Sequence, residues 1–314
     1  MTMASDMYAH CCGLFRAFLL SLVLTVPITS IASAHVGVTV PFVEVPDPAA
    51  IAIDGDDGDW AFFDTHLALD REGFFDRESD HVNAADFDFT IYTAWSPPPD
   101  NSWYCFARIS DDTLKIENED PLKWWRDDTL SITVDSDHSG GSIYGFTREE
   151  LVNGQRYYAR VLPLKHPRLP HGQAGFLDQH HDPFLEEFLW AMHKPHFDIA
   201  WTMRPPDAAN GTLHVEYTFE WKATLWDVLG PSLEESKRHV FAPGQTLHMG
   251  FRLLDADRPG SGRKHSMYIL GGHQHQDRNA DRMPDFRTIT LDEAQNWRMP
   301  VEQDVVQPSS VDGK

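Results

Sequence analysis

The side chains best suited to chemistry lie in one segment, residues 123–141, where two adjacent tryptophans precede an acidic pair and an acidic glycine turn. An indole ring offers a wide apolar face that can stack on the C–H side of a sugar ring. Neighbouring carboxylates accept hydrogen bonds from hydroxyl groups. Trp124 and Trp125 beside Asp128 therefore predict a surface that binds a neutral, hydroxyl-rich ligand. The alternative is that the tryptophans belong to the core.

The turn at residues 135–140 carries oxygen-bearing side chains at alternate positions and a glycine, as the first half of an EF-hand loop does. Phe146 stands where an EF-hand has its bidentate glutamate, so the segment is not an EF-hand. We expect Asp135, Asp137 and Ser139, together with backbone carbonyls, to hold a structural calcium ion. The alternative is an Asp/Ser/Gly turn that ends a strand.

Histidines concentrate in a proline-containing insertion, residues 164–196, which interrupts the strand pattern. They are His166, His171, His180, His181, His193 and His196. Neutral imidazoles bind zinc, copper or haem iron, so a haem or transition-metal site is one interpretation of the insertion. The other is a polar loop. The chain has no HExxH motif, so a hydrolytic zinc site is not predicted.

No arrangement of nucleophile and base stands out, and no G-x-S-x-G elbow is present. Carboxylates are abundant enough to supply the acid and base of a glycosidase, which keeps a hydrolase acting on O-glycosyl compounds open as an alternative. We expect a binding protein rather than an enzyme.

These residues must be positioned by strands. Runs with period-two alternation or short apolar stretches recur between proline- and glycine-rich turns, with no helical period between them. This pattern predicts an all-β, antiparallel β-sandwich of jelly-roll or immunoglobulin type. We expect one domain at residues 45–292, followed by a mobile polar tail at 293–314. The expected strands are 86–93, 103–109, 130–134, 156–161, 197–203, 212–220, 247–253, 267–270 and 288–291.

Residues 1–34 have an apolar run that ends in Ala32-Ser33-Ala34, which is typical of a secretory signal peptide. We therefore expect a secreted or periplasmic protein with no stable membrane insertion after cleavage. Of the three cysteines only Cys105 then remains, so no internal disulfide can form. The net charge of −22 argues against nucleic acid as a partner and suits neutral ligands and cations.

Four groups of residues, in chain order, carry a family resemblance: Ile53-Asp54-Gly55 with Asp59-Trp60, residues 89–95 with 103–112, residues 125–141, and residues 243–257 with 283–291. Together they resemble the family 9 carbohydrate-binding modules, a branch of the DOMON-like β-sandwiches. The resemblance implies non-catalytic glycan recognition associated with carbohydrate catabolism, and a calcium ion in the scaffold. Sugar-binding members of the family hold a terminal sugar between two tryptophans.

Carried over by position, the first of these tryptophans is Trp125, and Arg160 falls where the family has a ligand-binding arginine. The alternative for Arg160 is a strand residue paired with an acid. The second tryptophan would fall at residues 279–281, which hold no aromatic, and Ser131 replaces a sugar-contacting glutamate. Half of the aromatic clamp is therefore missing unless Trp95, Tyr144 or a residue of the insertion replaces the second tryptophan.

Certain DOMON-like relatives bind haem through Met and His or Lys ligands. Met192, His193 and Lys194 are adjacent in this chain. The resemblance thus also implies a second function, a haem- or metal-binding periplasmic module.

Overall fold

The computed structural model describes residues 38–78, 83–143, 154–165, 174–178, 188–257, 264–270, 272 and 278–298, and the structural statements below concern these residues. The predicted leader lies outside them. The strands are β1 (Thr39–Glu44), β2 (Leu69–Asp70), β3 (Phe74–Asp76), β4 (Phe87–Trp95), β5 (Trp103–Thr113), β6 (Thr129–Asp135), β7 (Gln155–Val161), β8 (Ala174–Asp178), β9 (Phe197–Arg204), β10 (Leu213–Ala223), β11 (Trp226–Val228), β12 (Lys237–Arg238), β13 (Thr246–Asp255), β14 (His265–Ile269) and β15 (Asp285–Ile289). The helical segments used below are the 3₁₀ helices η4 (Pro121–Arg126) and η6 (Leu189–Met192) and the α-helix α2 (Leu291–Asn296).

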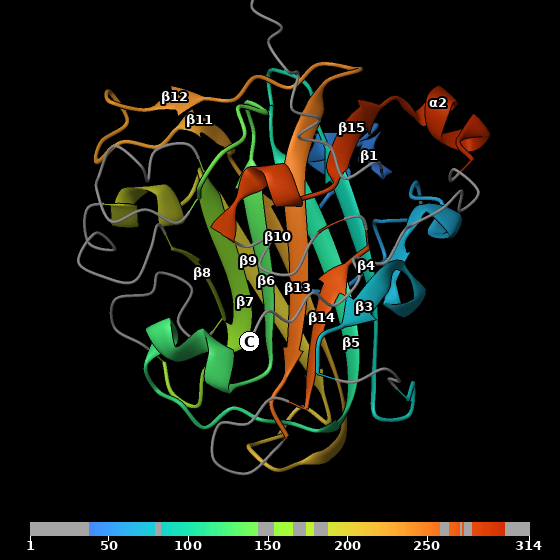
Figure 1. Ribbon diagram of the computed structural model, residues 1–314, viewed down its shortest axis with the longest axis vertical. Helices are drawn as coiled ribbons and strands as arrows, with labels where there is room; N and C mark the ends of the chain where they lie inside the picture. The colour runs from blue at the N-terminus through green and yellow to red at the C-terminus, as the bar shows by residue number, and fades with distance from the viewer. Residues whose placement is uncertain are drawn as a thin grey trace, which may run out of the picture. The chain divides into compact units, whose positions relative to one another are not determined.

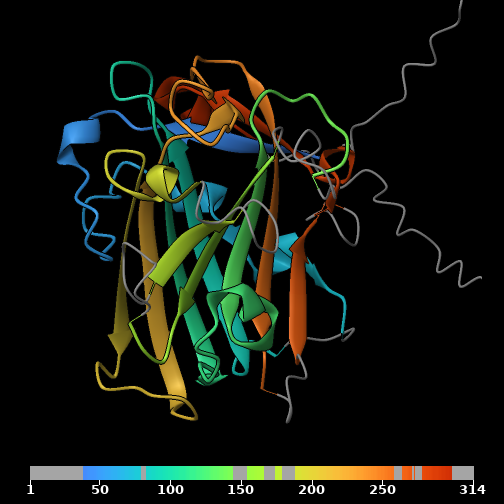
Figure 2. The same cartoon turned by 90° about the vertical axis from the view of Figure 1, so that its left-hand side faces the viewer.

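One large sheet folds back on itself into two facing layers, seen edge-on in Figure 2. The first layer runs β8-β7-β6-β13-β14-β3 and faces the viewer in Figure 1. The second runs β1-β4-β5-β10-β9, and β15 joins β13 to β1. Trp103 of β5 meets Tyr157 of β7 edge to face at 5.0 Å, which places the main core between the layers. The predicted β-sandwich is confirmed.

Side-chain alternation decides which residues reach this core. In β4, Phe87, Phe89 and Ile91 are buried whereas Asp88 and Thr90 are partly exposed. In β6 and β13 nearly every residue is buried, on both sides of the strand. The first layer is therefore covered on its outer side as well as its inner side, and the outer side carries most of the polar chemistry described below.

The Ile53-Asp54-Gly55 motif fastens the N-terminal segment to the second layer through one buried carboxylate. The backbone amides of Asp54 and Gly55 and the indole Nε1 of Trp60 donate to Glu220 of β10 at 3.0, 2.9 and 2.8 Å. Burial raises the pKa of Glu220 to about 7, although the three donors act in the opposite direction. Gly55 has φ +85°, and a Cβ there would lie 3.1 Å from the backbone of Trp201, so only glycine fits.

Two features differ from the sequence-based expectation. Strand β1 pairs in parallel with both β15 and β4, so the sheet is mixed rather than purely antiparallel. It also begins at Thr39, ahead of the expected domain start at residue 45. At the other end, Thr290 and Glu293 form a capping box that starts α2, and Trp297 packs against the hydrophobic cluster around Trp60. Helix α2 thus extends past the expected domain end at residue 292.

Candidate functional site

A single row of side chains crosses the outer side of the first layer. The inner-facing neighbours in these strands, such as Ile132 and Phe251, point into the core, so the alternate positions face outward. We call these residues the cross-strand row; in register order from β7 to β3 they are Tyr158, Ser131, Arg252, Tyr268 and Phe75. Ser131 lies in the middle of it.

Aromatic rings and one guanidinium fill the cross-strand row. Trp124 of η4 packs on Tyr158 with 4.9 Å between ring centroids. The Arg252 guanidinium lies 5.3 Å from the Trp124 ring and 4.8 Å from the Tyr268 ring, a cation–π arrangement on both sides. Tyr268 in turn stacks on Phe75 at 5.6 Å and 19°. The row is therefore a continuous aromatic platform with a cation set into it.

The middle of the platform is closed and its ends are partly open. Tyr268, Arg252 and Trp124 are 0, 5 and 5% exposed, whereas Trp125 and Phe75 are partly exposed. Neither the Trp124 indole nitrogen nor the Tyr268 hydroxyl has a hydrogen-bond partner within the described part of the chain. A buried polar group without a partner costs about 1–3 kcal/mol. Both atoms are themselves covered, so an external ligand would reach them only after the side chains above them move.

Trp125 is the predicted sugar-binding residue that the structure leaves most accessible. It meets Trp124 edge to face at 5.9 Å and 90° and packs against the main core with part of its surface. Trp124 is more deeply buried, in agreement with the alternative that the tryptophans belong to the core. Its ring still forms part of the platform. Trp124 therefore anchors η4, and Trp125 presents an aromatic face.

The other three predicted sugar-binding residues are corrected by the structure. Trp95 is fully buried in the main core, where its Nε1 donates to the carbonyl of Ile289 at 3.3 Å, so it cannot complete a clamp. Arg160 is fully buried in an ion pair with Asp127 and donates to the carbonyl of Asn118 at 2.9 Å, which anchors the chain around η4. Both have structural roles in this fold.

Asp128 is the third correction, because it belongs to an acidic cluster at the start of β6 and the end of β13. We define the acidic cluster as Asp111, Asp112, Asp128, Asp255 and Asp257, contributed by β5, β6 and β13 and the residues next to them. The carboxylate oxygens of Asp128 accept the backbone amides of Lys115 and Ala256 at 2.5 and 2.9 Å. Asp128 is 3% exposed, and these two hydrogen bonds hold its carboxylate within the acidic cluster.

Carboxylate oxygens converge within the acidic cluster. Those of Asp111, Asp112 and Asp257 lie within 4.8 Å of one another, and so do those of Asp128, Asp255 and Asp257. Asp111 Oδ2, Asp255 Oδ2 and Asp257 Oδ1 are buried and accept no hydrogen bond from any residue that the structure describes. An all-oxygen donor set with three unused buried oxygens has the chemistry of a calcium site.

Burial and mutual repulsion raise the pKa values across this cluster. Desolvation followed by the charge of Asp255 raises the pKa of Asp111 to about 8. The pKa of Asp257 rises to about 7 for the same two reasons, and burial raises that of Asp255 to about 6 and that of Asp128 well above its usual range. The cluster thus holds protons at neutral pH unless a cation replaces them.

Two basic residues border the acidic cluster. Lys264 Nζ lies 3.3 Å from both Asp112 and Asp257 and also pairs with Asp86. His265 is held between Asp76 and Asp86 at 2.6 and 2.7 Å. Burial lowers the pKa of His265, but these two hydrogen bonds outweigh it and raise the pKa to about 9.

The predicted calcium ligands at residues 135–139 have the hydrogen bonds of a turn. Asp135 Oδ2 accepts the backbone amide of Gly140 at 2.9 Å and contacts Nδ1 of His248 at 3.0 Å. Asp137 is exposed and accepts the amide of Ser139 at 3.2 Å. Burial raises the pKa of Asp135, but the hydrogen bond with His248 and further bonds outweigh it and leave the pKa below its usual value. The acidic cluster is therefore the better candidate for calcium.

The described part of the histidine-rich insertion does not assemble the haem ligands that the resemblance implied. Met192 of η6 is fully buried in the core, whereas His193 is exposed and the side chain of Lys194 is 72% exposed. These three side chains therefore do not converge on one iron. His166, His171, His180, His181 and Tyr144 lie outside the described residues.

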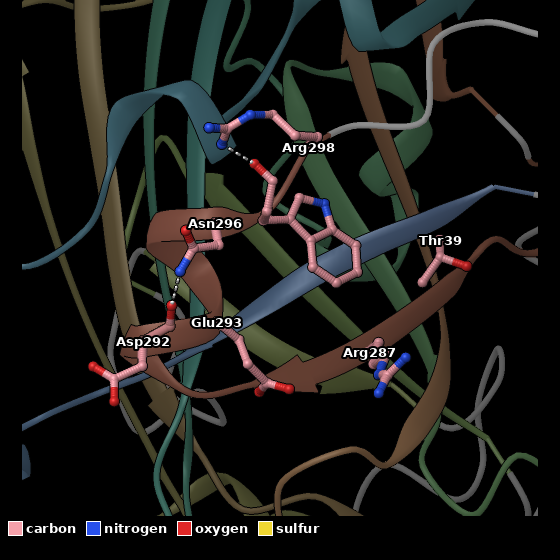
Figure 3. A pocket seen from close by; sticks show the side chains of 7 residues that line it. Thr39, Arg287, Asp292, Glu293, Asn296 and Arg298 are labelled. Carbon is pink, nitrogen blue, oxygen red and sulfur yellow. Dashed lines mark hydrogen bonds between the residues drawn. The ribbon is translucent and has the colours of Figure 1, made fainter.

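A shallow cavity of about 650 Å³ beside α2 was not anticipated from the sequence (Figure 3). Trp297 contributes an aromatic side chain, and its other lining residues are Thr39, Arg287, Asp292, Glu293, Asn296 and Arg298. It is open to solvent and far from the Trp125 motif in sequence. It provides a second aromatic surface against which the first can be tested.

Comparison with known proteins finds no matching protein-family model and no matching curated protein. Among solved structures, the chain is similar to a family 9 carbohydrate-binding module from Caldicellulosiruptor kristjanssonii in complex with cellotriose. The identity is 12% and the TM-score 0.48, over 86% of this chain and 100% of that chain. A glucose complex of a family 9 module from the same organism gives 13% and 0.49, over 80% and 96%. A putative carbohydrate-binding protein from Bacteroides uniformis gives 8% and 0.41, over 80% and 99%. Two of these three structures are of the family that the sequence motifs resemble.

Proposed function

We propose that this chain is a non-catalytic carbohydrate-binding protein whose ligand stacks on Trp125 at the edge of the cross-strand row. The observation that carries the proposal is the platform itself: a partly exposed indole continuous with Trp124, Arg252 and Tyr268. The Trp124 Nε1 and Tyr268 hydroxyl in that platform lack partners among the described residues. Apolar ring faces beside unused polar groups match the two kinds of surface that a sugar presents.

A calcium ion bound by the acidic cluster is part of the proposal. Asp111, Asp255 and Asp257 would supply the unused oxygens, and about six to eight oxygen ligands in all suit calcium. Asp128 connects this cluster to the platform, because it follows η4 by two residues and the hydroxyl of Thr129 donates to the carbonyl of Trp124 at 2.8 Å. Calcium would therefore hold η4, and with it Trp125, in place.

We propose that the protein is secreted or periplasmic and that it takes part in carbohydrate catabolism. This proposal rests on the apolar leader at residues 1–34 and on the resemblance of the motifs. No helix within the described ranges is long and apolar enough to cross a membrane.

Calorimetric titration of the calcium-loaded chain with a panel of mono- and oligosaccharides tests the proposal. Replacing Trp125 by Ala removes the stacking ring, and a loss of at least about tenfold in affinity is expected, since about 1.4 kcal/mol corresponds to tenfold. Trp297→Ala is the matched control, because Trp297 is also partly buried but lines the cavity beside α2. Sugar binding that survives Trp125→Ala and is lost in Trp297→Ala would refute the site, and no heat with any sugar would refute the function.

A further inference from the structure

Three residues in a different part of the first layer form one register row across β6, β13 and β15. His248 of β13 is paired with Asp135 of β6 on one side and with Asp285 of β15 on the other. Residues paired across neighbouring strands point to the same side of a sheet, so the imidazole lies between two carboxylates. The strands fix all three positions. A site built on strands holds its geometry better than one built on loops.

His138 completes this group from the turn that follows β6. Its Nε2 lies 3.2 Å from Asp285 Oδ1, and the Nε2 of His248 lies 3.5 Å from the same oxygen. The two imidazole rings face each other with centroids 3.9 Å apart and planes 30° apart. One ligand atom from each of the three residues lies within 4.8 Å of the other two. Two imidazole nitrogens and one carboxylate oxygen therefore converge.

Two of the three ligand-atom separations match those around a tetrahedral metal ion. Zinc–ligand distances of about 2.0–2.1 Å place tetrahedral ligand atoms about 3.3 Å apart. The observed separations of 3.2 and 3.5 Å from Asp285 Oδ1 to the two histidine nitrogens bracket this value. Imidazoles that share a tetrahedral ion have ring centroids about 5 Å apart. The rings of His138 and His248 are 3.9 Å apart, so they would have to separate by roughly 1 Å to seat the ion.

The environment of His248 is the one found around metal-binding histidines. Its side chain is 1% exposed, and its Nδ1 contacts Asp135 Oδ2 at 3.0 Å. A carboxylate that accepts the Nδ1–H fixes the tautomer in which Nε2 carries the lone pair, which is the form that binds a metal. Asp135, the last residue of β6, thus acts as a positioning residue for His248.

The turn after β6 positions the side chain of His138. His138 has φ +56°, in the left-handed region where asparagine, aspartate and histidine are enriched among the non-glycine residues. Gly140 and Gly141 in the same turn also have positive φ. The turn brings the His138 imidazole to within 3.2 Å of Asp285 Oδ1.

We propose that His138, His248 and Asp285 bind a divalent transition-metal ion of the zinc type, with Asp135 positioning His248. Three protein ligands leave a fourth position for water or for a donor atom of an external molecule. Mixed nitrogen and oxygen donors favour zinc over calcium, whereas the all-oxygen acidic cluster has the opposite preference. The two cation sites would therefore be chemically distinct.

The test uses the untagged full chain, stripped of metal and then kept in saturating calcium so that the acidic cluster is occupied. Zinc chloride is titrated by calorimetry, and bound zinc is counted after gel filtration. One zinc ion per chain is expected at a site that excess calcium does not block. His138→Asn, which tolerates the left-handed backbone, and Asp285→Asn are each expected to weaken binding at least tenfold, and Asp135→Asn by about 10–100-fold.

His214→Asn is the matched control, because His214 also has a left-handed backbone, φ +55°, but is exposed on β10 and belongs to none of the metal-ligand groups among the described residues. It should bind zinc as the parent chain does. Circular dichroism of each variant confirms that the fold is kept. The proposal is overturned if the parent binds no zinc, or if His138→Asn and Asp285→Asn both bind it like the parent. A loss in His214→Asn equal to that in His138→Asn would overturn it as well.

Discussion

Removal of calcium should make the stability of this chain fall as the pH rises from about 6 to 9. Asp111 has a folded pKa of about 8, and His265 one of about 9, whereas both release their protons at lower pH in the unfolded chain. A raised folded pKa means that the folded state binds more protons, so this stability is present at low pH and is lost as the pH rises through the folded value. Both groups act in the same direction.

The magnitude follows from the number of protons retained. Each proton that the folded chain holds and the unfolded chain lacks changes the free energy of unfolding by about 1.4 kcal/mol per pH unit. At pH 7.5 Asp111 and His265 together retain about 1.6 more protons in the folded chain, which gives a slope of about −2.2 kcal/mol per pH unit. Calcium bound as proposed would displace the carboxyl protons, so at 100 times its Kd it should add about 2.7 kcal/mol at pH 8 and progressively less at lower pH.

Urea unfolding at pH 6, 7 and 8, with EDTA or with calcium, measures these slopes. Asp111→Asn imitates the protonated carboxyl, so it should stabilise the calcium-free chain at pH 8 and remove most of the response to calcium. Glu119→Gln is the control, since Glu119 is exposed and outside the acidic cluster. A stability that rises with pH between 6 and 8 in EDTA, or an undiminished calcium response in Asp111→Asn, would refute the reasoning.

Three further predictions concern single buried groups. Asp127→Ala should destabilise the chain by about 3–5 kcal/mol in urea unfolding, because it leaves the fully buried Arg160 without its ion-pair partner; a cost below 1 kcal/mol would contradict that role. Glu220→Gln should cost about 1–3 kcal/mol at pH 8 in the same assay, since an amide cannot accept all three hydrogen bonds now made to the carboxylate, and an unchanged midpoint would argue against the anchor. Tyr268→Phe should be neutral or stabilising by about 1 kcal/mol, because the buried hydroxyl has no partner among the described residues. The same variant should bind sugar more weakly in calorimetry. A destabilised variant with full affinity would contradict both expectations.

The sequence predicted the strands well because alternation and turn residues are local signals. The expected strands at 86–93 and 130–134 became β4 and β6 with small shifts at their ends. Strand β1 was missed because Pro41 interrupts its apolar run, and a proline speaks against a strand interior. Its parallel pairing with β15 joins residues about 250 positions apart, which no local pattern encodes.

The candidate site was only partly predictable for the same reason. Trp125 was found because a motif surrounds it, but alternation cannot tell which side of a strand faces the core, and Trp95 proved to be fully buried. The acidic cluster was missed because β5, β6 and β13 bring its members together from distant parts of the chain. The available signal was that each aspartate stands where an alternating strand begins or ends. The pairing of His248 with Asp135 likewise depends on strand register.

The most direct test of the central claim is a crystal structure of the calcium-loaded chain with a bound oligosaccharide. We expect a sugar ring stacked on Trp125, with hydroxyl groups within hydrogen-bond distance of the Trp124 indole nitrogen or the Tyr268 hydroxyl. A sugar bound only at the Trp297 cavity, or no sugar at a concentration that saturates binding in solution, would contradict the assignment of the cross-strand row as the ligand site.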